Sequence, residues 1–447
     1  MNPASSMVLP EIDRSSSKWH LTMEAMLICG ALYSLLLGPV PIRVVGREPN
    51  IFFGDVVICL AAIYAFIGRR PRHMSDRLIR AVVTWMGLYS VVMLATLPHA
   101  VDFLRSIASA KLYIMPLIVF ITSARCFRSK ADLQRILLSC SLVGIGLSAG
   151  ALYNWSRFQS GAIELDAGLA AKDMVQMSGL RSNAVGGTAA MLLPGALYAL
   201  WHANLRWRLI GLVSLLGLCA TIIFSMSRGS MIAAIIGVGV SLILRVCGRS
   251  RNIDRKATWT LIAIAMAVFL GWQLFPAQLK FTLLTQIEIA DMQVSTPGET
   301  NGRFTRWEIL MHRSMKNPQG VGVGNYESLS AVQDARLGGS AHNLYLETLE
   351  EEGWLGLATL LLGLAYAWRA GRKMLSTQTA MEDEWTVVNV AWLVYLVNVA
   401  VEPNYFSVQF TYIFWIIVGA AAAAGAAGGR QEDGEAGSSG RVLAKAC

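Results

Sequence analysis

The chain has 447 residues, of which 54% are hydrophobic and only 15% are charged, and its mean hydropathy is +0.49. This apolar content exceeds what a soluble protein carries and excludes the soluble globular classes. The net charge of +9 comes from basic residues in short clusters between apolar segments, not from one dense patch, which argues against nucleic-acid binding. The sequence therefore predicts a basic membrane protein.

Twelve apolar segments are each long enough to cross roughly 30 Å of hydrocarbon as a helix. They lie near residues 19–38, 51–67, 78–97, 103–122, 133–153, 184–202, 207–224, 230–246, 257–275, 354–368, 385–401 and 406–425. We therefore predict an all-α polytopic domain over residues 19–425 with about 12 transmembrane helices. A polar N-terminal tail, residues 1–18, precedes it, and a disordered tail, residues 426–447, follows it.

The charge of the loops alternates along the chain and predicts the orientation of the helices. The connections after every second span, with their flanks and both tails, carry 24 of the 38 Lys and Arg residues. By the positive-inside rule this side is cytoplasmic, and both termini lie there. The opposite, outer side receives the connections 154–183 and 276–353 and the short turn at 225–230.

Two arginines on the outer side lie close to hydrocarbon, where a positive charge opposes the orientation bias and needs a reason. Arg228 lies in the turn between two apolar spans, and Arg181 lies just before the span at 184–202. Each either snorkels to a headgroup or caps a helix, or it binds an anion. From the residues alone, both interpretations stay open.

Residues 300–316 of the large outer loop predict an amphipathic helix. At 100° per residue, Arg303, Arg306 and Arg313 fall within roughly an 80° sector, next to an apolar sector that includes Trp307. Such a helix rests its apolar strip on the membrane interface. Its arginines then face either lipid headgroups or a phosphate-bearing substrate.

The outer side also offers a base and several carboxylates. Of the six histidines, only His99, His312 and His342 fall there, and His342 begins the helical pattern that leads into the tenth span. Alone, it is either an ordinary loop histidine or a proton acceptor. Glu347 and the acidic run 350–352 predict a solvated helix face, and no Asp/Glu pair or cysteine spacing indicates a metal site.

Several short motifs together resemble those of one family. They are Ser-Arg-Gly at 227–229, Gly302-Arg303 ahead of Trp307, the Asn317-Pro-Gln-Gly-Val-Gly turn, and His342-Asn343 followed after nine residues by Gly353. The turn is not a phosphate-binding loop, since no Lys-Ser/Thr follows its glycines and no strand precedes them. With this set of motifs the chain resembles the O-antigen ligase family, most densely over residues 179–365, within the wider O-antigen ligase/polymerase superfamily.

The resemblance implies a GT-C-like glycosyltransferase that works at the periplasmic face of a Gram-negative inner membrane. It would transfer O-antigen from undecaprenyl diphosphate to a sugar hydroxyl of lipid A-core oligosaccharide, without a metal or other cofactor. His342 matches the family's essential histidine, and Arg228 and Arg303 match two essential arginines. The other candidate positions are Arg181 with Asn183, Arg306, Arg313, Arg336, Trp307 and Asn343.

Elementary chemistry agrees with this assignment. A diphosphate leaving group needs no proton if fixed cations meet its developing charge, and Arg228, Arg303 and Arg306 supply such cations. The acceptor hydroxyl needs a base, and His342 among guanidinium groups is expected to stay neutral and able to accept the proton. A single displacement inverts the anomeric centre.

Three other functions stay open. An O-antigen polymerase shares the donor and often has two comparable outer loops, but here loop 154–183 has three basic residues against six in loop 276–353. A protein O-oligosaccharyltransferase has to present a polypeptide, and no large C-terminal domain for this is evident. A transporter should carry ionisable residues near the bilayer midplane. In this sequence the few candidates inside the predicted spans are Asp55, Lys111 and Arg105.

Overall fold

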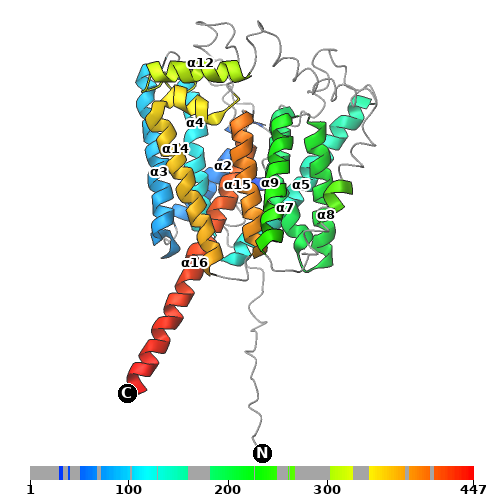
Figure 1. The fold of residues 1–447 in the computed structure, drawn as a ribbon, viewed down its shortest axis with the longest axis vertical. Coiled ribbons are helices and arrows are strands. Elements are labelled where there is room, and N and C mark those ends of the chain that lie inside the picture. Colours follow the sequence, from blue (N-terminus) through cyan, green and yellow to red (C-terminus); the bar gives the residue numbers. More distant parts are fainter. Residues whose placement is uncertain are drawn as a thin grey trace, which may run out of the picture.

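The computed structural model describes residues 30–33, 39–40, 51–67, 72–100, 103–127, 129–159, 182–225, 227–248, 260, 262–266, 303–325, 342–377, 382–402 and 407–446. This part of the chain is a bundle of helices (Figure 1). They are α2 (Phe53–Ile67), α3 (Arg77–Thr96), α4 (Phe103–Cys126), α5 (Lys130–Gln159), α7 (Ser182–Trp201), α8 (Leu205–Phe224), α9 (Arg228–Gly248), α12 (Arg303–Lys316), α14 (Leu344–Thr377), α15 (Glu382–Val401) and α16 (Val408–Ala446).

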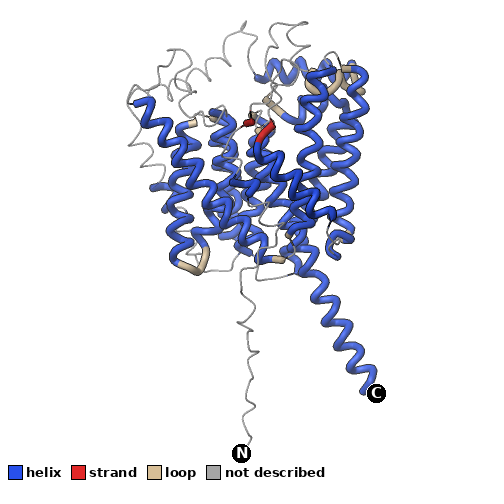
Figure 2. Tube along the Cα trace, turned by 180° about the vertical axis from the view of Figure 1, so that it is seen from behind, coloured by secondary structure: helices blue, strands red, loops and turns tan. Residues whose placement is uncertain are grey.

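Four short elements accompany these helices. Two are the 3-10 helices η2 (Arg72–Ser75) and η3 (Leu97–His99). The other two are the strands β1 (Pro39–Val40) and β2 (Ile51–Phe52), which pair antiparallel directly before α2 (Figure 2). Two residues per strand do not alter the all-α class.

Seven described helices are long and apolar enough to span a membrane. They are α3, α4 over Ser109–Cys126, α5 over Lys130–Asn154, α7 over Asn183–Trp201, α8, α15 over Asp383–Val401 and α16 over Val408–Ala427. Helix α2 and residues Arg228–Ile243 of α9 are apolar but shorter. These positions confirm the predicted all-α polytopic membrane fold. The predicted spans near 19–38 and 257–275 lie mostly outside the described residues, so the total of about 12 stays a prediction.

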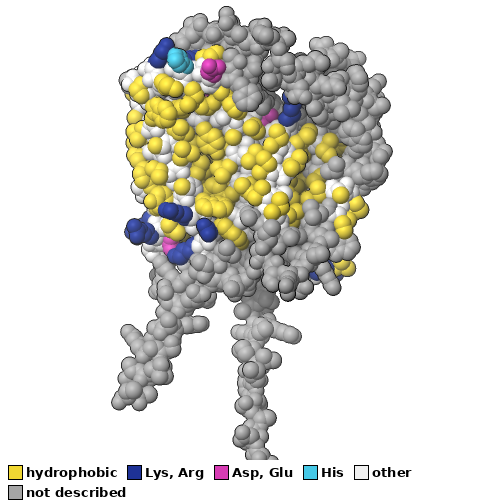
Figure 3. Space-filling model, viewed as in Figure 1, with side chains coloured by type: hydrophobic (Ala, Val, Ile, Leu, Met, Phe, Trp, Pro, Cys, Tyr) yellow, Lys and Arg dark blue, Asp and Glu magenta, His cyan; other side chains and the backbone are white. Residues whose placement is uncertain are grey.

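Apolar side chains form a band across the face of the molecule that Figure 3 shows, with charged side chains at its two ends. On α3 and α14, which lie on this face, Val91, Leu94, Leu361 and Leu362 are exposed. Soluble monomers rarely expose apolar patches of this extent, because water solvates them poorly. The band is therefore the surface that contacts hydrocarbon.

Exposed basic side chains gather at the end of the bundle opposite α12 (Figure 3). Arg77 and Arg80 lie at the start of α3, Arg206 at the start of α8, and Arg372 near the end of α14. The connections at the starts of α3 and α8 and at the end of α14, which the sequence groups on one side by their charge, thus lie at one end of the bundle.

Helices α7 and α16 are the most deeply buried spans, and small residues allow their neighbours to approach closely. A Cβ added to Gly195 of α7 would lie 2.5 Å from the Leu137 carbonyl oxygen of α5. One added to Gly419 of α16 would lie 3.0 Å from the Phe120 carbonyl oxygen of α4. Helix α16 continues to Ala446, beyond the expected end at residue 425, and its alanine run favours this continuation.

Helix α14 bends at Gly353, where φ is 72° and ψ is −171°. Such dihedrals are accessible to glycine and strained for other residues. The predicted turn at 317–322 packs against the bend so closely that a Cβ on Gly353 would lie 2.2 Å from the Pro318 carbonyl oxygen. Three backbone hydrogen bonds join the two segments: Val321 N to Glu350 O (2.9 Å), Gly322 N to Glu351 O (2.9 Å) and Trp354 N to Pro318 O (3.1 Å). The turn thereby fixes the orientation of residues 344–352, which precede the predicted span at 354–368.

Candidate functional site

Those predicted site residues that the structure describes gather at one end of the bundle, the end across which α12 lies (Figure 1). Helix α9 begins at Arg228, and α14 begins directly after His342-Asn343. The first turn of α12 contains Arg303 and Arg306. Four predicted arginines have side chains outside the described part of the structure: Arg181, Arg336, Arg303 and Arg306.

The Ser-Arg-Gly-Ser segment at 227–230 forms the start of α9. The backbone NH of Ser230 donates to Ser227 Oγ at 3.3 Å, so Ser227 caps the helix. The two hydroxyls lie 2.7 Å apart, and Asn398 Nδ2 of α15 donates to Ser230 Oγ at 3.3 Å. Arg228 lies in the first turn, and its side chain is exposed. The motif therefore anchors α9 to α15 and directs a guanidinium group outward.

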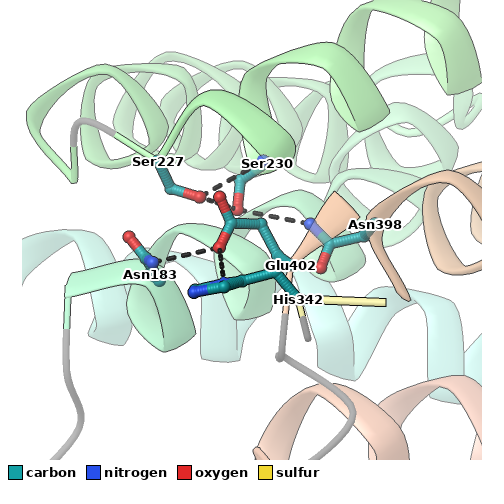
Figure 4. Close-up of polar contacts among 6 residues, drawn as sticks. All are labelled: Asn183, Ser227, Ser230, His342, Asn398 and Glu402. Carbon is teal, nitrogen blue, oxygen red and sulfur yellow. Dashed lines mark hydrogen bonds and ion pairs between the residues drawn. The ribbon is translucent and has the colours of Figure 1, made fainter. Parts of the chain in front are cut away.

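A buried carboxylate, that of Glu402 just beyond the end of α15, lies at the centre of this region (Figure 4). Its side chain is 2% exposed. One oxygen, Oε2, accepts a hydrogen bond from Asn183 Nδ2 of α7 at 3.0 Å and lies 3.7 Å from His342 Nδ1. Gly229 permits the approach of α9, because an added Cβ would lie 2.1 Å from Glu402 Cγ. Segments from four parts of the chain therefore meet at one carboxylate.

Glu402 is absent from the sequence-based candidates. The available signal is a single acidic residue at the outer end of the span 385–401, four positions after Asn398, whose carbonyl accepts a hydrogen bond from Glu402 N at 2.8 Å. A lone carboxylate at a helix end is ordinarily a solvated one, so only its burial reveals its importance.

His342 has a left-handed backbone conformation, with φ at 55°, which among the described non-glycine residues it alone adopts. The next residue, Asn343, caps α14, since its Oδ1 accepts hydrogen bonds from Tyr345 N (3.0 Å) and Leu346 N (3.1 Å). Asn343 thus has a structural role. It fixes where α14 starts and thereby holds His342 beside Glu402.

Three helices begin at this end, an arrangement that favours anions near their N-termini. The starts of α7, α9 and α14 all lie here, represented by Asn183, Gly229 and His342, and helix N-termini carry partial positive charge. Among the described residues the structure pairs His342 with the Glu402 carboxylate, whereas the sequence predicts guanidinium groups around it. The convergence of the three helix starts is suited to a diphosphate near Arg228.

Helix α12 is held to α14 by an ion pair and an apolar contact. Arg313 Nη2 lies 2.8 Å from Glu350 Oε1, and the Arg313 side chain is 18% exposed. Leu310 is fully buried and packs against Leu346. At these positions the helix faces α14, so Arg313 pairs within the protein, and the contact of the predicted apolar sector around Trp307 with the membrane stays a prediction.

The prediction of a solvated acidic face at the start of α14 is wrong. All four glutamates are buried: Glu347, Glu350, Glu351 and Glu352. Partners on other helices explain part of this, since Tyr113 of α4 donates to Glu351 at 2.9 Å. Burial raises the pKa of Glu350 to about 7. The charge of Arg313 lowers this pKa and the charge of Glu351 raises it further, but burial has the largest effect. The protonated Glu350 side chain therefore contributes to folding stability at a pH below the ordinary pKa of glutamate. This contribution is lost as the pH rises toward 7.

Two of the three charges inside the bundle that the transport hypothesis considers are paired with each other. Lys111 of α4 forms an ion pair with Asp55 of α2, and Tyr412 OH of α16 donates to the same carboxylate at 2.5 Å. The ion pair and the tyrosine hydrogen bond together join three helices, and the pairing offsets the cost of burying either charge. Arg105 has its side chain outside the described part of the structure.

Within the described residues, no group of three or more His, Cys, Asp or Glu side chains is arranged to hold a metal ion. The metal-independent reaction implied by the resemblance stays a prediction, since part of the outer loop lies beyond these residues.

The close approach at Gly229 makes a testable prediction. Gly229→Ala introduces a Cβ within 2.1 Å of Glu402 Cγ and 2.9 Å of Val401 Cγ2, so it should displace the carboxylate and cost on the order of 1–3 kcal/mol. The thermal unfolding midpoint of the purified protein should fall. Gly239→Ala, on the same helix, is the control, because no atom lies within 4 Å of its added Cβ. That variant should unfold at or above the wild-type temperature, and equal losses in both would contradict the close approach.

Comparisons with known proteins support the resemblance drawn from the motifs. A family model described as O-antigen ligase matches residues 213–361. The match runs from α8 through the bend of α14 and includes Arg228, α12 and His342. No curated protein matches the chain.

Proposed function

We propose that this chain, whose residues 213–361 match the O-antigen ligase family model, is a ligase that transfers O-antigen from undecaprenyl diphosphate to a sugar hydroxyl of lipid A-core oligosaccharide. The observation that carries the proposal is that two matched motifs, at Arg228 and His342, both contact Glu402 at one end of a membrane-spanning bundle. A base and an anion-binding group are thus available beside a membrane, where both lipid-linked substrates reside.

In the proposed reaction His342 Nε2 accepts the proton of the acceptor hydroxyl while the hydroxyl oxygen attacks the anomeric carbon of the donor sugar. The bond from that carbon to the diphosphate oxygen breaks, and its electron pair leaves with undecaprenyl diphosphate. Arg228, with Arg303 and Arg306 of α12, neutralises the developing charge in the role that a metal ion fills in other transferases. A single displacement inverts the anomeric centre.

The proposed orientation puts the α12 end of the bundle in the periplasm of a Gram-negative bacterium and the opposite end in the cytoplasm. It is supported by the exposed basic residues at the opposite end, such as Arg77, Arg206 and Arg372, because positive charge is retained on the cytoplasmic side. The C-terminal end of α16 then lies in the cytoplasm.

The proposal is tested with the purified chain in lipid nanodiscs, a defined undecaprenyl diphosphate glycan, lipid A-core and a metal chelator. The expected product is lipid A-core that carries the glycan. The donor alone should give no longer lipid-linked glycan, and a polypeptide acceptor should stay unmodified. Extension of the donor alone would indicate a polymerase, modification of the polypeptide a protein O-oligosaccharyltransferase, and no product at all would contradict transferase activity.

A further inference from the structure

Glu402 takes no part in the bonds that the proposed reaction makes and breaks, yet it lies beside the histidine that accepts the proton. Its side chain is 2% exposed, and a buried carboxylate is costly unless neighbours compensate its charge. The Asn183 amide donates to it at 3.0 Å, and the start of α9 approaches it at Gly229. The surrounding helices are therefore built to hold a carboxylate at this point.

The two edges of the His342 ring face different surroundings. Nδ1 is a buried atom and lies 3.7 Å from Glu402 Oε2, while the side chain as a whole is 27% exposed. Figure 4 shows the other ring nitrogen pointing away from Glu402. One nitrogen is thus turned to the carboxylate, and Nε2 lies on the opposite edge of a partly exposed ring.

The separation of 3.7 Å is longer than a hydrogen bond, which is about 2.7–3.2 Å between nitrogen and oxygen. Hydrogen bonds in catalytic sites are often long before substrate binds and shorten in the substrate complex. Even at the longer distance the carboxylate attracts a positively charged imidazolium. Glu402 is therefore close enough to act on the histidine through its charge.

We propose that Glu402 is the positioning residue of His342, and that its carboxylate keeps the proton of the neutral ring on Nδ1 so that Nε2 accepts the proton of the acceptor hydroxyl. The same carboxylate stabilises the imidazolium that forms, and Glu402 itself takes up no proton. Asn183 holds the carboxylate from α7. The identity of the reaction rests on the proposed function, whereas the pairing with His342 is independent of it.

The kinetic test uses Glu402→Gln, which keeps the size of the side chain and removes its charge. We expect kcat to fall by about 10²-fold or more, with the KM for the donor little changed, because the variant alters proton acceptance and not donor binding. Glu384→Gln is the matched control. Glu384 is a buried carboxylate at the other end of α15, where it accepts from Gln134 Nε2 at 2.6 Å. Its variant should keep wild-type kcat, and equal losses in both variants would overturn the proposal.

A double variant separates positioning from an independent role. If Glu402 acts only through the histidine, His342→Ala/Glu402→Gln should be no slower than His342→Ala alone. A further loss in the double variant would show that Glu402 contributes without His342 and would overturn the positioning role.

A spectroscopic test needs no substrate, so its failure is distinguishable from a failure of the ligase proposal. Magnetic resonance of protein with isotope-labelled histidine nitrogen identifies His342 by the signal lost in His342→Gln. The wild-type neutral ring should carry its proton on Nδ1, and Glu402→Gln should weaken that preference. Asn183→Ala, which removes a donor to the carboxylate, should give a smaller change of the same kind if Glu402→Gln does not fold. An unchanged His342 signal in these variants would overturn the proposal.

Discussion

Replacing His342 with alanine should lower the rate of glycan transfer to lipid A-core by about 10²- to 10⁴-fold, the range that a general base contributes. In the proposed reaction the His342 imidazole beside Glu402 is the base, and alanine cannot accept the proton of the acceptor hydroxyl. Initial rates with purified protein and saturating substrates measure the effect. The variant should remain in the membrane in wild-type amount, because His342 lies outside the helices that are long and apolar enough to span the membrane.

His312→Ala is the matched control for this prediction. His312 lies on α12 at the same end of the bundle, and its side chain is exposed. Its variant should transfer glycan at the wild-type rate. Near wild-type transfer by His342→Ala would show that the base assignment is wrong.

Arg228→Ala should lower the transfer rate by about 10²- to 10³-fold, since it removes a cation that meets the charge developing on the diphosphate. Arg228→Lys should restore part of the rate, because lysine keeps the charge but loses the paired donors that match phosphate oxygens. Rates measured with donor at several concentrations separate a loss of donor binding from a loss of turnover.

The control for Arg228 is Arg372→Ala, which removes an exposed arginine at the opposite end of the bundle. That variant should leave transfer unchanged. If both arginine variants lose the same activity, the effect reports general charge and not diphosphate binding. A wild-type rate for Arg228→Ala would remove Arg228 from the site.

The helical fold could be predicted because each span carries its own signal. A run of apolar residues about 20 long needs no distant partner to be recognised, since hydrocarbon imposes the same requirement on every span. The bend of α14 could not be found in this way. Gly353 is one glycine in a helical pattern, and its unusual dihedrals follow from the turn at 317–322 that packs against it.

The candidate site could be predicted only in part. His342 and Arg228 belong to short motifs with a recognisable spacing, and the structure brings both motifs to Glu402. Glu402 itself has no motif in the sequence. Its position depends on how α15 packs against α7 and α9, which is information that no single segment contains.

The glutamates at the start of α14 show the same limit, but here the sequence leads to a wrong prediction and not to a missed residue. A run of three acidic residues is ordinarily solvated, so the sequence favours an exposed face. The structure buries them because Arg313 arrives from α12 and Tyr113 from α4. Both partners lie far away in the sequence, and their contact follows from the tertiary fold.

The contact between the turn at 317–322 and α14 is made by main-chain atoms, with a glycine on each side. Pro318 and Gln319 at the tip of the turn are exposed, and the hydrogen bonds use no side chain of either. The position of α14, which begins directly after His342-Asn343, therefore does not depend on which side chains the exposed tip of the turn carries. Substitutions at the surface of the turn are therefore expected to leave the start of α14, and with it the place of His342, unchanged.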